Sequence, residues 1–279
     1  MPELPEVETV RRGIAPVLEG QRLIMAKAMR ADLRVPIPKN FSKALENKRV
    51  DRVDRRSKYL LIYMEDGLVL ILHLGMSGRI TLYNRQQQTP PPIGKHDHLV
   101  FETENGILMV FNDPRRFGMA VFGDAATINQ HPLLKNMGPE PISNAFHPQY
   151  LEEAFKNRTG SIKNILLNQK IIAGLGNIYV CEALFRSGIH PTRAANSLSK
   201  KDIEALVPNI VSVIRQAIEA GGSTLKDYAQ VDGDLGYFQH SFQVYGRENE
   251  SCFHKECKDT VARIVQSSRS TFYCPTCQQ

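Results

Sequence analysis

The sequence predicts an α+β protein: an N-terminal β-sandwich with a leading helix, a helical second domain and a cysteine-rich β tail. Apolar residues recur at helical spacing over 4–18, several short β-type segments lie between 59 and 122, and helical spacing returns after 149. The 279 residues are enough for two domains and a small third module. The expected bounds are 1–132 for the sandwich domain, 133–148 for a linker, 149–240 for the helical domain and 241–279 for the tail.

The leading helix is predicted from the apolar positions Leu4, Val7, Val10, Ile14 and Leu18. They fall three or four residues apart and so share one helix face. Proline is tolerated in a first helical turn, which accommodates Pro5, and Gly20 is a typical residue just beyond a helix end.

The sandwich is predicted from short β-branched or aromatic segments separated by turn residues such as Asp66-Gly67 and Glu104-Asn105-Gly106. Many short strands at this spacing favour two antiparallel sheets. The predicted strands are Tyr59–Met64, Leu68–Leu74, Arg79–Tyr83, His98–Glu102, Ile107–Asn112 and Met119–Phe122.

The second domain is predicted to be helical, and its most informative segment is Gly174-Leu175-Gly176-Asn177. Two glycines before a helix start expose backbone N–H groups that can hold a phosphate, although a tight turn between packed helices explains them equally well. Predicted helical segments are Tyr150–Phe155, Ile162–Leu167, Ile178–Phe185, Ile203–Leu206 and Ile210–Ile218.

The tail has the pattern C-x4-C-x16-C-x2-C, formed by Cys252, Cys257, Cys274 and Cys277. Two close cysteine pairs joined by a hairpin-length stretch predict one structural zinc ion with four thiolate ligands and no open position for catalysis. Disulfides or chance clustering are the alternatives, and His254 could replace one ligand. The expected strands are 260–265 and 271–273, and Cys181 is expected to be a small buried residue.

The net charge of +6 is concentrated at one end of the chain. Residues 1–58 contain 14 Lys and Arg against 8 Asp and Glu, so the remaining 221 residues are neutral overall. This asymmetry suits an anionic partner, with nucleic acid the first candidate, but on charge alone a solvated basic surface is the simpler explanation. The apolar runs are too short to span a membrane, and the start of the chain does not resemble a signal peptide, so we expect a cytoplasmic protein.

Two glycine-flanked loops present side chains suited to a base stack. Asp113–Gly118 carries Arg115 and Phe117, and His73–Gly78 carries Met76. Arginine and apolar side chains at loop tips can wedge between bases, although a surface turn with a core phenylalanine is the simpler alternative. His73 is expected to be an interior histidine, and Lys95–His98 a basic turn rather than a metal site.

Pro2 would carry a free secondary amine if the initiator methionine were removed. Such an amine is partly neutral at physiological pH and can attack an electrophilic carbon to form an iminium ion. Glu3 and Glu6 lie beside it as candidate acids or bases, but many chains that begin Met-Pro have no such chemistry.

Taken together, these motifs resemble those of the bacterial formamidopyrimidine-DNA glycosylases. The resemblance runs in order along the whole chain, and the looser first cysteine pair is the one departure from the usual pattern. The motifs are MPELPEVET at 1–9, Lys58 in RRSKYL, HLGMSGR at 73–79, NDPRRFG at 112–118, AGLGNIY at 173–179 and the four-cysteine tail.

The resemblance implies a β-sandwich, a helix-two-turn-helix domain and a zinc finger, with damaged double-stranded DNA between the domains. It implies a monomeric base-excision-repair enzyme that flips out and excises oxidised purines and then cleaves the strand. Pro2 would be the nucleophile and Glu3 the general acid. Lys58 would contact phosphates at the lesion and assist proton transfer, although it could be one more cation among Arg52, Arg55 and Arg56. Arg269 would hold the lesion phosphate and assist the second elimination.

The other implied site residues contact DNA or shape the pocket. Met76, Arg115 and Phe117 would fill the space that the flipped base leaves, and Glu6 would shape the pocket. A loop over 223–237 would close over the base. Backbone contacts are implied for His96, Arg158, Lys163 and Asn177, with Arg158 equally explained as a solvated helix end.

Two alternatives stay open at this point. An endonuclease VIII-like glycosylase for oxidised pyrimidines would share the architecture, and a non-catalytic zinc-containing DNA-binding protein would share the basic segment and the finger. The expected location is the bacterial cytoplasm, at the nucleoid through DNA binding.

Overall fold

The computed structural model describes residues 2–223 and 237–279 and divides the chain into two compact units. The first unit comprises residues 2–135 with 220–223 and 237; the second comprises 136–219 with 238–279. The predicted α+β class is confirmed. In the described residues, we find no helix long and apolar enough to cross a membrane.

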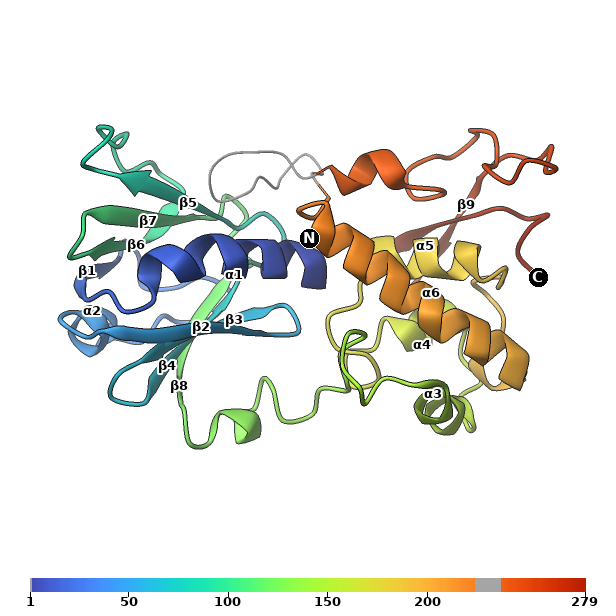
Figure 1. Ribbon diagram of the computed structural model, residues 1–279, viewed down its shortest axis with the longest axis horizontal. Helices are drawn as coiled ribbons and strands as arrows, with labels where there is room; N and C mark the ends of the chain where they lie inside the picture. The colour runs from blue at the N-terminus through green and yellow to red at the C-terminus, as the bar shows by residue number, and fades with distance from the viewer. Residues whose placement is uncertain (1, 224–236) are drawn as a thin grey trace. The chain divides into compact units, whose positions relative to one another are not determined.

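The first unit is a β-sandwich of two four-stranded antiparallel sheets (Figure 1). One sheet has the order β1-β6-β7-β5 and the other β2-β3-β4-β8. The strands are β1 (Leu23–Ala28), β2 (Val50–Arg56), β3 (Tyr59–Met64), β4 (Leu68–His73), β5 (Arg79–Asn84), β6 (Asp97–Thr103), β7 (Ile107–Asn112) and β8 (Met119–Asp124), with a short helix α2 (Phe41–Leu45) and a 3₁₀ turn η1 (Ile128–Gln130).

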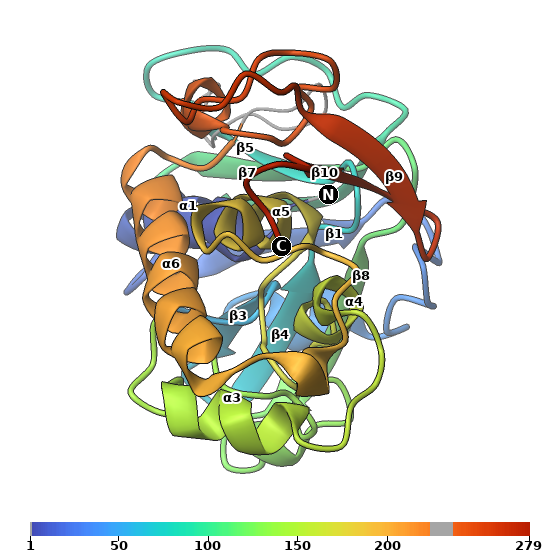
Figure 2. The ribbon, with the colours of Figure 1, turned by 90° about the vertical axis from the view of Figure 1, so that its right-hand side faces the viewer.

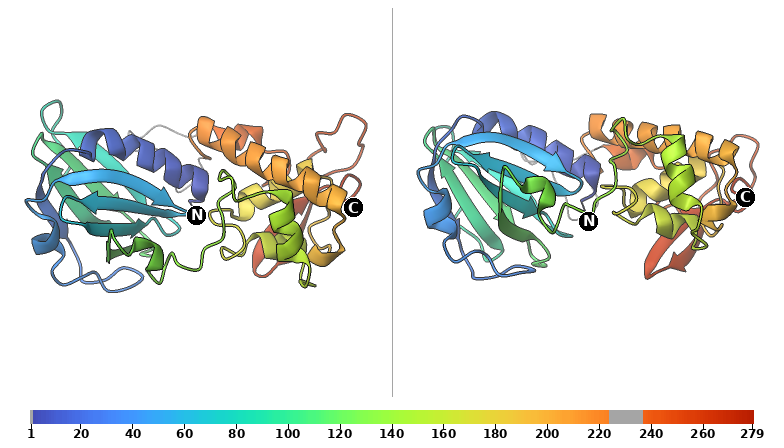
Figure 3. Two further views of the ribbon diagram at one scale, coloured as in Figure 1. Left: turned by 60° about the horizontal axis from the view of Figure 1, so that its bottom comes forward. Right: turned by 90° about the horizontal axis from the view of Figure 1, so that it is seen from below.

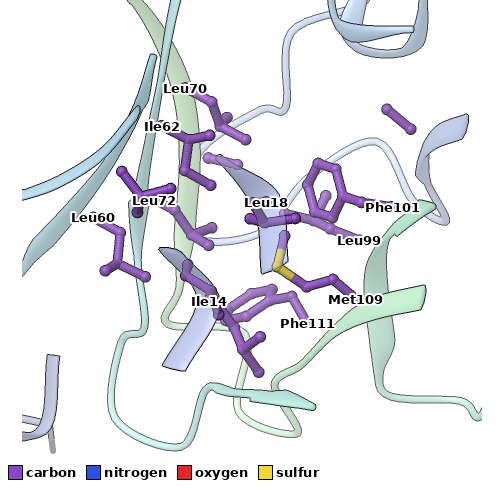
Figure 4. Packing of buried hydrophobic residues seen from close by; sticks show 14 of the residues in the cluster. Ile14, Leu18, Leu60, Ile62, Leu70, Leu72, Leu99, Phe101, Met109 and Phe111 are labelled. Carbon is purple, nitrogen blue, oxygen red and sulfur yellow. The ribbon is translucent and has the colours of Figure 1, made fainter. Parts of the chain in front are cut away.

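Helix α1 (Leu4–Leu18) supplies the third element of this core (Figure 3). Its Ile14 and Leu18 lie between two groups of side chains (Figure 4). One group consists of leucine and isoleucine side chains of β3 and β4, and the other of leucine, phenylalanine and methionine side chains of β6 and β7. Both α1 residues are essentially unexposed. Burying such side chains contributes about 1.5–3 kcal/mol each, which fixes the helix to the sandwich.

Strands β1 and β2 were not predicted, and their pairing explains why. Each contains a register shift, between Leu23 and Met25 in β1 and between Val50 and Arg52 in β2. The buried positions are therefore three residues apart, Leu23 with Ala26 and Val50 with Val53, and the alternation typical of a strand is lost.

The second unit packs four helices and a β-hairpin (Figure 2). The predicted helices at 203–206 and 210–218 are one helix with Pro208 inside it. An internal proline costs about 3 kcal/mol, but one apolar stripe from Ile203 to Ile218 is buried on both sides of it. The elements are α3 (Pro148–Phe155), α4 (Ile162–Leu166), α5 (Asn177–Arg186), η2 (Ala195–Ser197), α6 (Lys200–Glu219), η3 (Phe238–Ser241), β9 (Ala262–Gln266) and β10 (Arg269–Tyr273).

Candidate functional site

Pro2, Glu3 and Glu6 lie at the start of α1, where the chain forms a capping box. Glu3 is the N-cap; its side chain accepts from the backbone amide of Glu6, and its own backbone N–H donates to Glu6 Oε2 at 2.8 Å. Pro2 is buried, and Glu3 and Glu6 are 3% and 2% exposed. The box satisfies amide groups that a helix start leaves unpaired and so fixes the backbone of Glu3.

The second carboxylate oxygen of Glu6 binds a distant part of the same unit. Glu6 Oε1 accepts from the backbone N–H of Ser223 at 2.9 Å and from its hydroxyl at 3.0 Å. Gly222 has φ +81°, and a Cβ there would lie 3.1 Å from Glu6 Cγ. Glu6 therefore joins the start of α1 to Ser223. The predicted closing loop continues through residues 224–236, which lie outside the described residues.

Lys58 lies with Ser57 in a tight turn between β2 and β3 that a buried ion pair supports. Ser57 has φ +57°, and its carbonyl accepts from Arg55 Nη1 at 2.8 Å. Arg55 Nε in turn lies 3.2 Å from Glu8 Oε2, on α1. Burial alone would raise the pKa of Glu8, but hydrogen bonds from Arg11 and Arg12 and the charges of Arg11 and Arg55 hold it at about 2. Glu8 is therefore ionised across the functional pH range.

His73 lies at the end of β4 as the interior histidine that was expected. Its Nδ1 accepts from the backbone N–H of Gly75 at 2.9 Å, and its ring packs 4.9 Å from that of Tyr59. Burial, followed by the positive charges of Lys58 and Arg34, lowers its pKa to about 4. His73 is neutral at pH 7, and Lys58, only 7% exposed, is near enough to contribute to that shift.

The two glycine-flanked loops lie against each other. A Cβ on Gly75 would be 2.4 Å from the backbone nitrogen of Gly118, so the backbones touch. Phe117 is 43% exposed, and the Arg115 guanidinium lies 5.0 Å from the centroid of its ring. The structure thus places Met76, Arg115 and Phe117 on one pair of connected loops.

His96 is exposed just before β6 and lies near the buried His98, with 6.4 Å between ring centroids. Within residues 2–223 and 237–279, the Lys95–His98 turn forms no cluster with the geometry of a metal site.

In the second unit, Lys163 and Asn177 both bind the strand that begins with Arg269. Lys163 is fully buried, and its Nζ donates to Thr271 Oγ1 at 2.6 Å and to the Ser270 carbonyl at 3.1 Å. Asn177 Nδ2 donates to that same carbonyl at 2.9 Å. Both side chains therefore hold β10, and their contact with DNA stays a prediction.

Arg269 itself is exposed and follows a two-residue turn whose residues Ser267 and Ser268 have φ +48° and +61°. Positive φ at both positions is the backbone of a type I′ hairpin turn. Asn164 Nδ2 donates to Ser267 Oγ at 3.0 Å and ties the turn to α4. Arg158 lies apart from this group: its side chain is exposed, and its Nε donates to the carbonyl of Ala154 at the end of α3.

The four tail cysteines converge as predicted. Their Sγ atoms lie within 4.8 Å of one another, with 3.8 Å between Cys252 and Cys277 and 3.7 Å between Cys257 and Cys274. A tetrahedral zinc with Zn–S bonds of about 2.3 Å requires sulfur atoms about 3.8 Å apart, so the cysteines fit the ion.

The thiols of the cysteine cluster lie in unlike surroundings. Burial raises the pKa of the thiols of Cys252 and Cys277, whereas a backbone hydrogen bond at Asp259 lowers the pKa of Cys257. Zinc binds cysteine as the thiolate, and the positive charge of the ion compensates the charges of its ligands. Cys181 and Phe185 of α5 pack on the cluster, which confirms that Cys181 is a buried apolar residue. The arrangement supports one structural zinc ion.

The sequence reasoning did not single out three residues that hold the loops and the turn described above. Asp113 binds Ser77 and the Gly118 amide, and Arg55 pairs with Glu8, which lies 47 residues away. The Asp113-Pro114 pair after a strand is a turn signal that could have drawn attention to the carboxylate. No local pattern marks Glu8 or Arg55.

Comparison with known proteins decides the family. Residues 1–120 match the model of the formamidopyrimidine-DNA glycosylase N-terminal domain, 137–229 that of its H2TH domain, and 255–279 that of the zinc finger found in FPG and IleRS. The chain belongs to the formamidopyrimidine-DNA glycosylase family. The predicted resemblance and the three-part architecture are thereby confirmed, as is the enzyme class, a glycosylase of base excision repair. Neither the pyrimidine-specific nor the non-catalytic alternative is supported.

The similarity extends over the full length of its relatives. Formamidopyrimidine-DNA glycosylases of Dinoroseobacter shibae and Ruegeria pomeroyi are 55% and 53% identical, with all of each chain covered. The crystal structure of the MutM (FPG) protein from Thermus thermophilus has a TM-score of 0.86 at 40% identity and covers 99% of this chain and 98% of its own. A Lactococcus lactis FPG mutant in complex with Fapy-dG containing DNA has a TM-score of 0.90 at 35% identity and full coverage of both chains.

Proposed function

We propose that this glycosylase excises formamidopyrimidines and 8-oxoguanine from duplex DNA and then cleaves the strand as a lyase. The observation that carries the proposal is the capping box, which fixes Glu3 one residue after Pro2 at the buried start of α1. Relatives of the same family bind DNA containing Fapy-dG and DNA with an abasic site. Damaged double-stranded DNA is thus the expected partner, and association with the nucleoid follows from it.

The first chemical step is nucleophilic displacement of the base. With Met1 removed, the nitrogen lone pair of Pro2 attacks C1′ of the flipped nucleotide, and the glycosidic electron pair leaves with the base, which takes up a proton. Glu3 donates a proton to the sugar ring oxygen as the ring opens, and an iminium ion joins Pro2 to C1′. Lys58 lies on the same unit and is assigned to assist proton transfer.

Strand cleavage follows from the iminium ion. The iminium acidifies the C2′ proton; its loss expels the 3′ phosphate by β-elimination, and a second elimination expels the 5′ phosphate. Arg269 would hold the phosphate during that second step from its place at the start of β10. The four-cysteine zinc centre has no open position and contributes a fixed mount for the hairpin rather than a chemical step.

The binding residues are assigned by the same reasoning. Met76, Arg115 and Phe117 lie on connected loops and would occupy the vacated space in the stack. Glu6 would shape the pocket beside Glu3. The backbone contacts proposed are those of His96, Arg158, Lys163 and Asn177.

The test of this assignment is single-turnover excision by the Glu3→Gln variant on a duplex with one 8-oxoguanine. General acid catalysis is typically worth about 10²–10⁴-fold, so we expect the rate to fall at least about a hundredfold. Glu19→Gln is the matched control, because Glu19 lies at the other end of α1 and accepts from the Val53 amide at 2.9 Å. Wild-type excision by Glu3→Gln would contradict the role of Glu3.

A further inference from the structure

Asp113 lies at the start of the loop that carries Arg115 and Phe117 and is fully buried. Both oxygens of its carboxylate are used. Oδ1 accepts from the Ser77 hydroxyl at 2.6 Å, and Oδ2 accepts from the backbone N–H of Gly118 at 2.7 Å. Ser77 belongs to the loop that carries Met76, so a single carboxylate joins the two loops.

Ser77 extends this connection to Arg115. While its hydroxyl donates to Asp113, its oxygen accepts from the backbone N–H of Arg115 at 3.2 Å. Asp113, Ser77 and Arg115 thus form a short chain of hydrogen bonds that begins at the buried carboxylate. Bonds to a charged acceptor are about twice as strong as bonds between neutral groups.

The backbone of Asp113 is also hydrogen-bonded to a third segment that is predicted to contact DNA, the one that contains His96. Its N–H donates to the carbonyl of His96 at 2.9 Å, and its own carbonyl accepts from the Arg116 amide and from His98 Nε2, the latter at 2.9 Å. Burial lowers the pKa of His98, so the ring is neutral, and a carbonyl partner requires its proton on Nε2.

Steric contact leaves the two loops little freedom to move separately. A Cβ on Gly118 would lie 2.7 Å from Phe111 Cζ and 3.0 Å from Asp113 Oδ2, and one on Gly75 would overlap the backbone of Phe117. Gly75 also has φ +69°, which disfavours any other residue. The loops therefore pack as one unit whose hydrogen-bonded centre is Asp113.

We propose that Asp113 is a positioning residue that holds Met76, Arg115 and Phe117 in one fixed arrangement for insertion into the base stack. The inference rests on the proposed function of those three side chains. Asp113 acts through Ser77 and the Gly118 amide and does not touch the reacting atoms. A misplacement of about 1 Å can cost a hundredfold in rate, so the arrangement of these loops matters for base extrusion.

The variant that tests this is Asp113→Asn, which keeps the size of the side chain. Its amide oxygen can accept from the Gly118 N–H while its amide nitrogen faces Ser77, whose hydroxyl oxygen must then accept instead of donating, so both charge-assisted bonds are replaced by neutral ones. The readout is stopped-flow fluorescence of 2-aminopurine placed opposite a tetrahydrofuran site in a duplex, which reports unstacking without any chemistry. We expect the fluorescence rise to slow at least about tenfold, the loss expected when two charge-assisted bonds become neutral ones.

Two further variants separate positioning from folding. Asp124→Asn is the matched control: its exposed carboxylate accepts from the Ala126 amide at 2.9 Å in a turn at the opposite end of β8 from both loops, and it should leave the rise unchanged. Ser77→Ala removes one link and leaves the Gly118 bond, so it should slow the rise by a smaller factor. If Asp113→Asn does not fold, Ser77→Ala alone decides, and a wild-type rise in that variant overturns the proposal.

Cleavage of an abasic site in single-stranded DNA provides the second readout. There is no stack to open in that substrate, so Asp113→Asn should cleave it at the wild-type rate, and an equal loss on both substrates would contradict a positioning role. If the wild type opens the stack but excises no base, the proposed chemistry fails while the role of Asp113 stands. If the wild type excises the base and Asp113→Asn opens the stack normally, only the present inference fails.

Discussion

Glu6 accepts the backbone N–H of Glu3 at 2.8 Å through Oε2, while its other oxygen accepts both the amide and the hydroxyl of Ser223. One carboxylate therefore fixes the residue proposed as the general acid and the residue that precedes the segment 224–236. Because Glu6 is almost fully buried, neither bond is readily replaced by water.

The Glu6→Gln variant should retain the fold and excise the base more slowly. Glutamine has only one acceptor oxygen, so either the Glu3 amide or Ser223 loses its partner, at a cost of about 0.5–2 kcal/mol in stability for a lost cap. Urea unfolding measures that cost, and single-turnover kinetics should show a slower excision step. Glu46→Gln is the control, since Glu46 accepts from the Ala26 amide at 3.1 Å elsewhere in the unit. Excision at the wild-type rate would show that Glu6 does not position Glu3.

Lys163→Met should alter the balance between the two eliminations. It removes both bonds from Nζ to Ser270 and Thr271 and so loosens β10 beside Arg269, at a cost of about 1–3 kcal/mol. On abasic-site DNA, we expect the unsaturated aldehyde left by β-elimination to accumulate at the expense of the phosphate end left by both eliminations. Lys200→Met, which removes an exposed lysine at the start of α6, should leave the product ratio unchanged. An unchanged product ratio in Lys163→Met would show that Lys163 does not influence the second elimination through Arg269.

Cys274→Ser should lose the zinc ion and DNA cleavage together. A structural zinc site contributes directly to folding, and Cys274 is fully buried at the centre of the finger. Metal analysis should give one zinc per chain for the wild type and for Cys181→Ala, a buried cysteine outside the four-sulfur cluster. Full zinc content or full cleavage in Cys274→Ser would contradict the assignment.

His73 predicts a pH dependence of stability for the first unit. Its pKa is about 4 in the folded protein against 6.5 ordinarily, so the unfolded chain binds a proton that the folded one does not. This contribution to the free energy of unfolding is complete above pH 6.5 and is lost as the pH falls toward 4, by as much as about 3 kcal/mol. His73→Asn keeps an acceptor for the Gly75 amide but does not titrate, so urea unfolding of the variant should show a smaller loss. If the free energy of unfolding of the wild type and of His73→Asn changed with pH in the same way, His73 would not be the cause of the pH dependence.

The sequence predicts most elements of the fold because their patterns are local. The observed α1, β3 and β7 have the predicted bounds. Prediction failed where the pattern depends on a distant partner. The bulges in β1 and β2 arise from pairing with β6 and β3, and α6 continues through Pro208 because other helices cover its apolar stripe.

The residues of the candidate site differ in the same way, because some are marked by a local pattern and others depend on a distant partner. The cysteine ligands are recognisable from their spacing, and the N-terminal cluster is recognisable from its resemblance to the family's motif. The residues that hold them are not, because Lys163 binds a strand 107 residues away and Asp113 binds Ser77 36 residues away. Such pairs are hydrogen bonds between buried polar groups that come together only in the folded chain, so they produce no periodic pattern in the sequence.

The central claim is that Pro2 is the nucleophile, and borohydride trapping tests it most directly. The protein, with Met1 removed, is incubated with a duplex carrying 8-oxoguanine opposite cytosine, the adduct is reduced, and the modified peptide is identified by mass spectrometry. The proposed chemistry predicts that the secondary amine of Pro2 becomes a stable tertiary amine. The sugar is then found attached to the N-terminal peptide. An adduct on a lysine such as Lys58, or no adduct despite intact DNA binding, would contradict it.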